Sequence, residues 1–142
     1  MKFFNKKQLN HYHQYHSYLK TISLLGKVYR NFFIFQKIKK NISGLLLDYG
    51  CGLGDMLNIY KNSIGVDINP YNIEFCRSKG YNVYLLDELL KKNKKFDSII
   101  LDNVIEHVKN PSKIIKNLKK FSKKNTKLII GVPGSRAYEC DA

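Results

Sequence analysis

Carboxylate side chains are scarce in this sequence, and most of them stand where they could assemble into one binding site. The chain of 142 residues has 11 Asp and Glu against 25 Lys and Arg, and no acid precedes position 48. Most of the following seven acids come after short apolar runs: Asp48, Asp55, Asp67, Asp87, Glu88, Asp102 and Glu106. Carboxylates gathered in one pocket attract cationic groups and hydroxyls and disfavour polyphosphates.

A glycine-rich loop connects the first two of these acids. Residues 48–55 read DYGCGLGD, so that glycine recurs at every second position. Glycine tolerates positive φ angles and lets a ligand approach the backbone closely. A dinucleotide-binding loop has the spacing G-x-G-x-x-G and places a pyrophosphate at the start of the following helix, and this loop departs from that spacing.

Asp67 ends the apolar run IGVD and is the candidate for a ribose-binding acid. In nucleoside-binding βαβ units a carboxylate at this point accepts hydrogen bonds from ribose hydroxyls. The alternative is that Asp67 only caps the helix that follows it. Asn69 directly precedes Pro70 and fits the capping role better, so the ribose interpretation is favoured.

Five apolar runs that alternate with helix signals must position these residues. Strands are expected at residues 45–47, 63–66, 81–86, 98–101 and 127–132. Helices are expected to begin at Pro70 and Pro111, and Gly80 ends the first of them. The pattern predicts an α/β fold with a Rossmann-like, doubly wound, mainly parallel sheet of about five strands. The acids would then project at its carboxyl edge, where such sheets bind ligands.

Residues 1–44 are expected to form a helical cap segment ahead of the sheet domain at 45–142, within one globular domain overall. One or two amphipathic helices are predicted from apolar residues at helical spacing, namely Tyr18, Ile22, Leu25, Tyr29 and Phe33. Three histidines alternate with tyrosines in this segment and are candidates for ligand contacts: His11, His13 and His16. Their spacing fits surface residues better than a metal site.

Four segments carry a wider pattern, in the order LLLDYGCGLGDML, IGVDINPYNIEFCRSKGYNV, FDSIILDNVIEHVKNPSKIIKNL and KLIIGVPG. Together they resemble the successive motifs of class I S-adenosylmethionine-dependent methyltransferases, in the branch that includes quinone-biosynthesis enzymes. The resemblance covers roughly residues 43–134 and implies S-adenosyl-L-methionine as the cofactor. It implies cofactor contacts from Asp48, Gly50, Cys51, Gly52, Gly54, Asp67, Ile68, Asp87, Glu88, Asp102 and Asn103.

The resemblance also implies a role for each part of this set. The glycine loop holds the methionine end of the cofactor, and Ile68 packs against adenine. Either Asp87 or Glu88 lies near the adenine amino group. Asp102 and Asn103 line the methyl group that is transferred.

His107 is the candidate general base, since histidine titrates near neutrality. The alternative is a helix residue that hydrogen-bonds locally and shapes the floor of the pocket. A base is required only if the acceptor must lose a proton. In some relatives the pair that matches Glu106 and His107 binds a metal together with an earlier acid. Asn103 occupies that earlier position here, so no metal is expected.

The function expected from these residues is methyl transfer to a small-molecule or biosynthetic-intermediate acceptor. A truncated, non-catalytic cofactor-binding or interaction module is the alternative, and an RNA methyltransferase is less favoured. The net charge of +14 suits RNA, but 22 Lys, 14 Asn and 15 Ile also reflect a general compositional bias. The lysine runs lack the regularly interleaved aromatic residues of a nucleic-acid surface.

The predicted sheet ends early for this family, whose members usually add an antiparallel hairpin after the fifth strand. The fifth strand would then be an unpaired apolar edge, through which self-association is conceivable. No apolar run is long enough to span a bilayer. The absence of a signal-peptide pattern, and three cysteines without paired or metal-type spacing, predict a cytoplasmic location.

Overall fold

The computed structural model describes residues 4–21 and 24–132. Its strands are β1 (Leu46–Tyr49), β2 (Ser63–Asp67), β3 (Val83–Leu85), β4 (Phe96–Asp102) and β5 (Ser122–Gly131). The segments that precede β1 are α1 (Lys6–Thr21), α2 (Leu24–Tyr29), the π-helix η1 (Arg30–Phe35) and α3 (Gln36–Lys39). The later helices are α4 (Asp55–Ile59), α5 (Pro70–Ser78), α6 (Leu86–Lys91), the 3₁₀ helix η2 (Ile105–His107) and α7 (Pro111–Phe121).

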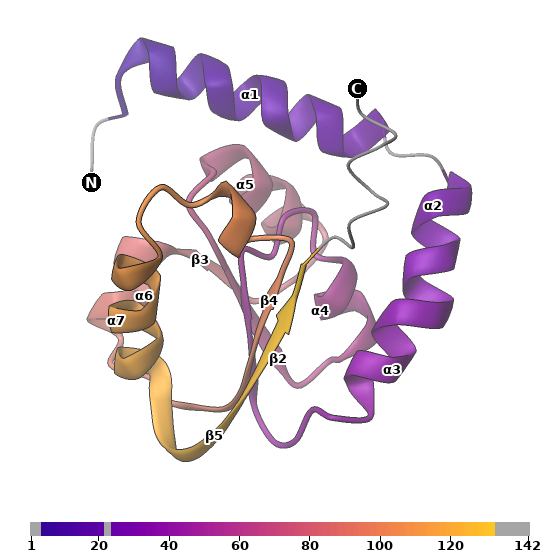
Figure 1. The fold of residues 1–142 in the computed structure, drawn as a ribbon. Coiled ribbons are helices and arrows are strands. Elements are labelled where there is room, and N and C mark those ends of the chain that lie inside the picture. The colour runs from indigo at the N-terminus through magenta and orange to yellow at the C-terminus, as the bar shows by residue number, and fades with distance from the viewer. Residues whose placement is uncertain (1–3, 22–23, 133–142) are drawn as a thin grey trace.

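These elements form three layers, with one parallel sheet between two layers of helices (Figure 1). The strand order is β3-β2-β1-β4-β5, and each neighbouring pair is parallel. The predicted Rossmann-like fold class is therefore confirmed, and no antiparallel strand occurs within the described ranges. Several strand boundaries differ from the prediction, which placed the third strand at 81–86 and the fourth at 98–101. Asp48 lies inside β1 rather than after it, and β5 begins at Ser122, directly after α7.

Apolar side chains on the two faces of the sheet hold the layers together. On one face Leu47 and Ile99 pack with Phe121 of α7, and Leu89 of α6 belongs to the same buried cluster. The other face buries Leu46 and Ile100 against Phe35 of η1 and Met56 of α4. Alternate residues of β1 thus face opposite layers, so the central strand is buried along its whole length.

The helix signals read from the sequence occur where they were expected. The Asn69 side chain accepts a hydrogen bond from Tyr71 N at 3.0 Å, and Pro70 is the first residue of α5. Gly80, at a φ of 77°, follows the end of that helix. The buried residues of α7 are Ile114, Asn117, Leu118 and Phe121, whereas Ile115 is 51% exposed.

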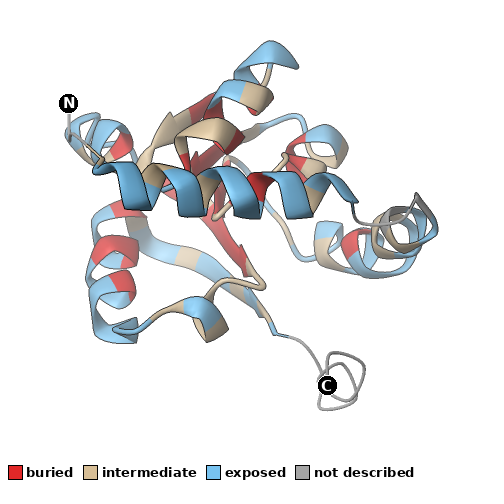
Figure 2. Cartoon of the chain, turned by 90° about the horizontal axis from the view of Figure 1, so that it is seen from above, coloured by how far each residue is buried: buried red, intermediate tan, exposed pale blue. Residues whose placement is uncertain are grey.

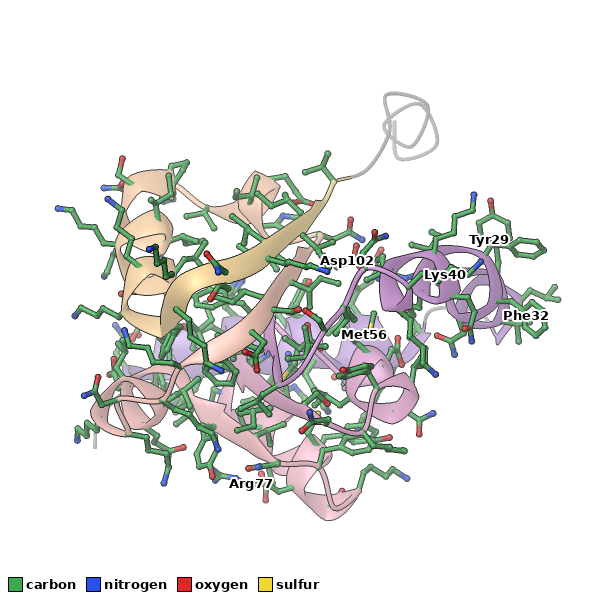
Figure 3. The ribbon with its side chains drawn as sticks, turned by 90° about the horizontal axis from the view of Figure 1, so that it is seen from below. Tyr29, Phe32, Lys40, Met56, Arg77 and Asp102 are labelled. Carbon is green, nitrogen blue, oxygen red and sulfur yellow. The ribbon has the colours of Figure 1, made fainter. Side chains whose placement is uncertain are left out.

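The predicted N-terminal helices are present, but the predicted apolar stripe is not their buried face. Tyr18, Leu25, Tyr29 and Phe33 are between 57% and 82% exposed, and Ile22 lies outside the described residues. Figure 3 shows Tyr29 and Phe32 directed away from the sheet. Helical periodicity detects a stripe without saying whether another element covers it.

Helix α1 crosses above the carboxyl ends of the strands (Figure 1). Seen from above, it is exposed along nearly all of its length, with a buried segment that corresponds to His16 (Figure 2). It therefore lies over the predicted ligand edge and touches it at few points. No helix in the described ranges combines the length and apolarity needed to cross a membrane.

Candidate functional site

The predicted site residues converge at the centre of the carboxyl edge. Strand β1 lies between β2 and β4, and this is the point at which the chain reverses its direction of winding. Asp67 and Asp102 are the last residues of β2 and β4, and Asp48 lies between them in β1. The structure therefore brings three of the predicted acids to three adjacent strands.

The glycine loop is held against β2 and against the segment after β4. Gly50 N and Cys51 N both donate to Val66 O, at 2.7 and 3.1 Å. A Cβ at Gly50 would lie 2.5 Å from Val104 Cγ2, so this glycine is required by protein packing. A Cβ at Gly52 would meet only Leu19 of α1, at 3.8 Å. Gly52 thus faces the space beneath α1.

Asp67 is tied into the same loop by three hydrogen bonds. Its Oδ2 accepts from Gly52 N at 2.9 Å and from Asn72 Nδ2 at 3.1 Å, while Oδ1 accepts from Asn69 N at 2.8 Å. Burial raises the pKa of Asp67, and these donors act in the opposite direction. The carboxylate is therefore fixed in position, and its Oδ1 accepts only one of these three hydrogen bonds.

Two contacts fasten α1 to this network. His16 Nδ1 lies 2.8 Å from Asn72 Oδ1, so the chain His16, Asn72, Asp67 joins α1 to the end of β2. Asn69 Nδ2 donates to Tyr12 O at 2.9 Å. Of the three predicted histidines, His16 is buried, whereas His11 and His13 are exposed.

Asp48 has the most perturbed electrostatics of the site. Its pKa is raised from 3.8 to about 8, mainly by burial and in addition by the neighbouring charges of Asp102, Asp67 and Asp55, while Arg30 acts in the opposite direction. Two acids on flanking strands thus disfavour a third negative charge between them. A cation placed here would relieve that repulsion.

Asp102 has a partner that the sequence analysis missed. Arg30 Nη2 lies 2.5 Å from Asp102 Oδ2, across 72 positions of sequence. Burial raises the pKa of Asp102, Arg30 lowers it, and Glu106 raises it. Asn103 follows with a φ of 52° and donates its backbone N–H to Gly131 O at 3.0 Å. The only available signal for Arg30 was the scarcity of arginine, which occurs three times in the chain.

The remaining predicted cofactor residues lie in different surroundings. Ile68 is 57% exposed beside Asp67. Glu88 Oε2 accepts from Arg77 Nη2 and from Leu85 N, each at 2.9 Å. Asp87 is exposed in the first turn of α6. Cys51 is buried in a core cluster with Cys76, so its thiol faces the protein interior and only its backbone lies in the loop.

The pair at 106–107 is split by the fold. His107 is exposed, whereas both carboxylate oxygens of Glu106 are buried. The two oxygens have no hydrogen-bond partner among the described residues. Residues 4–21 and 24–132 contain no group of three or more His, Cys, Asp or Glu side chains arranged to hold a metal ion.

The comparisons with known proteins agree with this geometry. A family model described as a methyltransferase domain matches residues 9–140. A ubiquinone biosynthesis O-methyltransferase of Pelagibacter ubique is 36% identical over 97 residues, which are 61% of this chain and 40% of that protein. An uncharacterised protein of Methanocaldococcus jannaschii is 30% identical over 100 residues, which are 68% of this chain and 49% of that protein.

A solved structure extends the likeness to the fold. A methyltransferase from Thermotoga maritima that depends on S-adenosylmethionine superposes with a TM-score of 0.77 at 23% identity, covering 92% of this chain and 68% of that one. The chain spans less than half the length of the curated relatives it matches. With the family model matched over nearly the whole sequence, the chain belongs to the methyltransferase domain family.

Proposed function

We propose that this chain transfers a methyl group from S-adenosylmethionine to a small-molecule acceptor. The observation that carries the proposal is the convergence of Asp48, Asp67 and Asp102 around the glycine loop. When bound, the cofactor supplies an electrophilic methyl group on a sulfonium centre. The residues fit this molecule, because Gly52 faces space that a side chain would fill and the surrounding acids suit its cationic centres.

The nucleoside half of the cofactor would lie on the β2 side of the site. Asp67 would accept a ribose hydroxyl, since a carboxylate has about four acceptor positions and protein donors use three. The exposed side chain of Ile68 would pack against adenine. Either Asp87 or Glu88 would lie near the adenine amino group, and the carboxylate of Glu88 also bonds Arg77.

The methionine half would lie between β1 and β4. Asp48 and Asp102 would stabilise the sulfonium and the α-ammonium group electrostatically, and Asn103 would line the transferred methyl. A nearby cation favours the ionised form of a carboxyl, so cofactor binding would draw a proton from Asp48. The backbone of residues 50–54 would supply the close approach that glycine permits.

The acceptor we infer is a small molecule rather than a nucleic acid. Four acids surround this edge, at 48, 55, 67 and 102, and Arg30 is already paired with one of them. A phosphate backbone would be repelled from such a pocket. Residues 1–44 would cover the acceptor in the complex, as α1 already lies above the glycine loop.

Catalysis would rest mainly on positioning, because in-line methyl transfer requires the acceptor atom to face the methyl carbon. His107 remains our candidate base where the acceptor must lose a proton. Its exposure gives it access to solvent. A transfer assay with His107→Gln at pH 6 and pH 8 would show a loss confined to acceptors that must be deprotonated.

Cofactor binding by the isolated chain is the first test. Asp67→Ala is expected to weaken the calorimetric affinity for S-adenosylmethionine about 10- to 100-fold, because one hydrogen bond to a charged group contributes roughly 1.5–3 kcal/mol. Asp97→Ala is the matched control, since Asp97 pairs with Lys123 away from the site. Equal affinities would remove the site assignment. Transfer of labelled methyl to extract fractions then separates an enzyme from a non-catalytic binding module.

A further inference from the structure

Four buried side-chain atoms lack a hydrogen-bond partner among the described residues, and they belong to two neighbouring segments. They are Arg30 Nε and Asn31 Oδ1 in η1, and both oxygens of Glu106 in η2. Buried polar groups are almost always hydrogen-bonded, and a buried carboxylate without a partner is costly. A cluster of such atoms therefore points to a ligand that completes their bonding.

The two segments meet at the end of β4. Arg30 reaches Asp102, the last residue of that strand, at 2.5 Å. Val104, between Asp102 and η2, lies so close to Gly50 that a Cβ there would be 2.5 Å away. Glu106 is thus carried by a segment that packs directly on the cofactor loop. Segment η1 is a π-helix. Such helices are rare in proteins overall, and those that occur are often found at functional sites.

Tyr15 of α1 interacts electrostatically with the same charged groups. Burial raises the pKa of its hydroxyl, and the charges of Asp67 and Glu106 raise it further, while Arg30 lowers it. All three charged groups therefore lie within electrostatic range of one tyrosine. The cluster sits beneath α1 and beside the proposed methionine subsite.

The charges around this space are unequally satisfied. Asp102 has the guanidinium of Arg30, and Asp67 has three donors. Glu106 has neither a cation nor a donor within bonding distance among the described residues. Three of the four unpartnered atoms are acceptors and one is a donor. The complementary ligand group is rich in N–H or O–H donors and carries positive charge.

We propose that the carboxylate of Glu106 binds the methyl acceptor, and that this acceptor is a small amine held as its ammonium ion. The inference rests on the proposed function and specifies the substrate class of that site. The ammonium is a recognition group, because a protonated nitrogen has no lone pair with which to attack the methyl carbon. The acceptor atom is a second nucleophile on the same molecule, and Arg30 Nε donates to an oxygen beside it.

The α-ammonium of the cofactor is the competing occupant, so the test measures the two ligands separately. The first measurement is the calorimetric affinity for S-adenosylhomocysteine of the wild-type chain, Glu106→Gln and the control Glu74→Gln. Glu74 is an exposed acid of α5 outside the cluster. We expect the three affinities to agree within about twofold. A tenfold loss in Glu106→Gln alone would overturn the proposal, because it would assign the carboxylate to the cofactor.

The second measurement uses matched probes on chain saturated with S-adenosylhomocysteine. The pairs are tyramine with 4-ethylphenol, and butylamine with 1-butanol. The first member of each pair carries an ammonium group, which the second member lacks or replaces by a hydroxyl. We expect the ammonium member to bind at least about tenfold more tightly in the wild type and in Glu74→Gln. In Glu106→Gln that preference should fall to about one, and Glu106→Asp should retain part of it.

Equal binding of the two members in the wild type, or an unchanged preference in Glu106→Gln, would overturn the assignment while leaving the cofactor site intact. Failure of the wild type to bind S-adenosylhomocysteine would instead count against the proposed function itself. A thermal scan separates ligand binding from a structural role, because loss of a structural residue would lower the melting temperature. A residue kept for ligand binding leaves the melting temperature of Glu106→Gln equal to or above that of the wild type.

Discussion

The two strands that flank β1 end in acids whose surroundings differ sharply. On the β2 side, Asp67 is bonded to Gly52 N, Asn69 N and Asn72, and through Asn72 to His16. On the β4 side, Asp102 pairs with Arg30, and buried polar atoms nearby have no hydrogen-bond partner within residues 4–21 and 24–132. The β2 side is thus completed by the protein itself. The β4 side is left for ligands to complete, which agrees with our proposals that place both the methionine half of the cofactor and the methyl acceptor there.

The largest test of this contrast replaces each acid by its amide. Asp67→Asn is expected to lower the free energy of unfolding by about 3 kcal/mol, because two backbone N–H groups and Asn72 lose a charged acceptor. Asp102→Asn should lower it by only about 1 kcal/mol, since a single partly exposed ion pair is weakened. Urea denaturation of both variants measures the difference. Equal losses would show that the two sides are equally self-supporting.

A second pair of variants separates packing from ligand space within the glycine loop. Alanine at Gly50 or at Gly52 must adopt a left-handed backbone, which costs about 1–2 kcal/mol. Gly50→Ala adds a clash with Val104, whereas Gly52→Ala meets only Leu19 at 3.8 Å. Gly50→Ala should therefore unfold at clearly lower urea, and Gly52→Ala should mainly lose cofactor affinity. The reverse ranking would contradict this division of roles, and Val104→Ala should partly rescue Gly50→Ala.

The acid between the two sides gives a pH-dependent test. The folded chain keeps Asp48 protonated up to about pH 8, whereas the unfolded chain releases that proton near pH 3.8. The unfolded state binds fewer protons in this interval, so the free energy of unfolding falls as pH rises, by at most about 1.4 kcal/mol per pH unit. Asp48→Asn should flatten this decline between pH 5 and pH 8. Parallel profiles for the variant and the wild type would refute the assignment.

The smallest expected effect concerns the contact of α1 with the β2 side. His16→Phe keeps a ring beside Tyr71 and Phe75 but leaves Asn72 Oδ1 without its partner. We expect a loss of about 1 kcal/mol in unfolding free energy and a few-fold loss of cofactor affinity. His13→Phe is the control, because His13 is exposed and also packs against Tyr71. Identical behaviour of the two variants would remove His16 from the network.

Much of the sheet and of the β2 side could be predicted from sequence, because both depend on short-range patterns. Apolar runs followed by acids, and Asn69 before Pro70, are local signals with local physical causes. The β4 side was harder to predict from the sequence. Its central contact joins Arg30 to Asp102 across 72 positions, and no periodicity encodes such a pairing. The same limit applies to the N-terminal apolar stripe, because helical spacing does not say whether another element covers the stripe, and four of its residues are exposed.

The sparse attachment of α1 has a consequence for the rate at which ligands exchange. Only His16 of this helix is buried, whereas all four residues of β1 beneath it are. Amide hydrogens of α1 should therefore exchange through a small local opening, and those of β1 only through global unfolding. Because α1 lies over Gly52, the same opening uncovers the cofactor loop. If the proposed function is right, the timescale of turnover would then be set by how often α1 detaches, without any movement of the sheet.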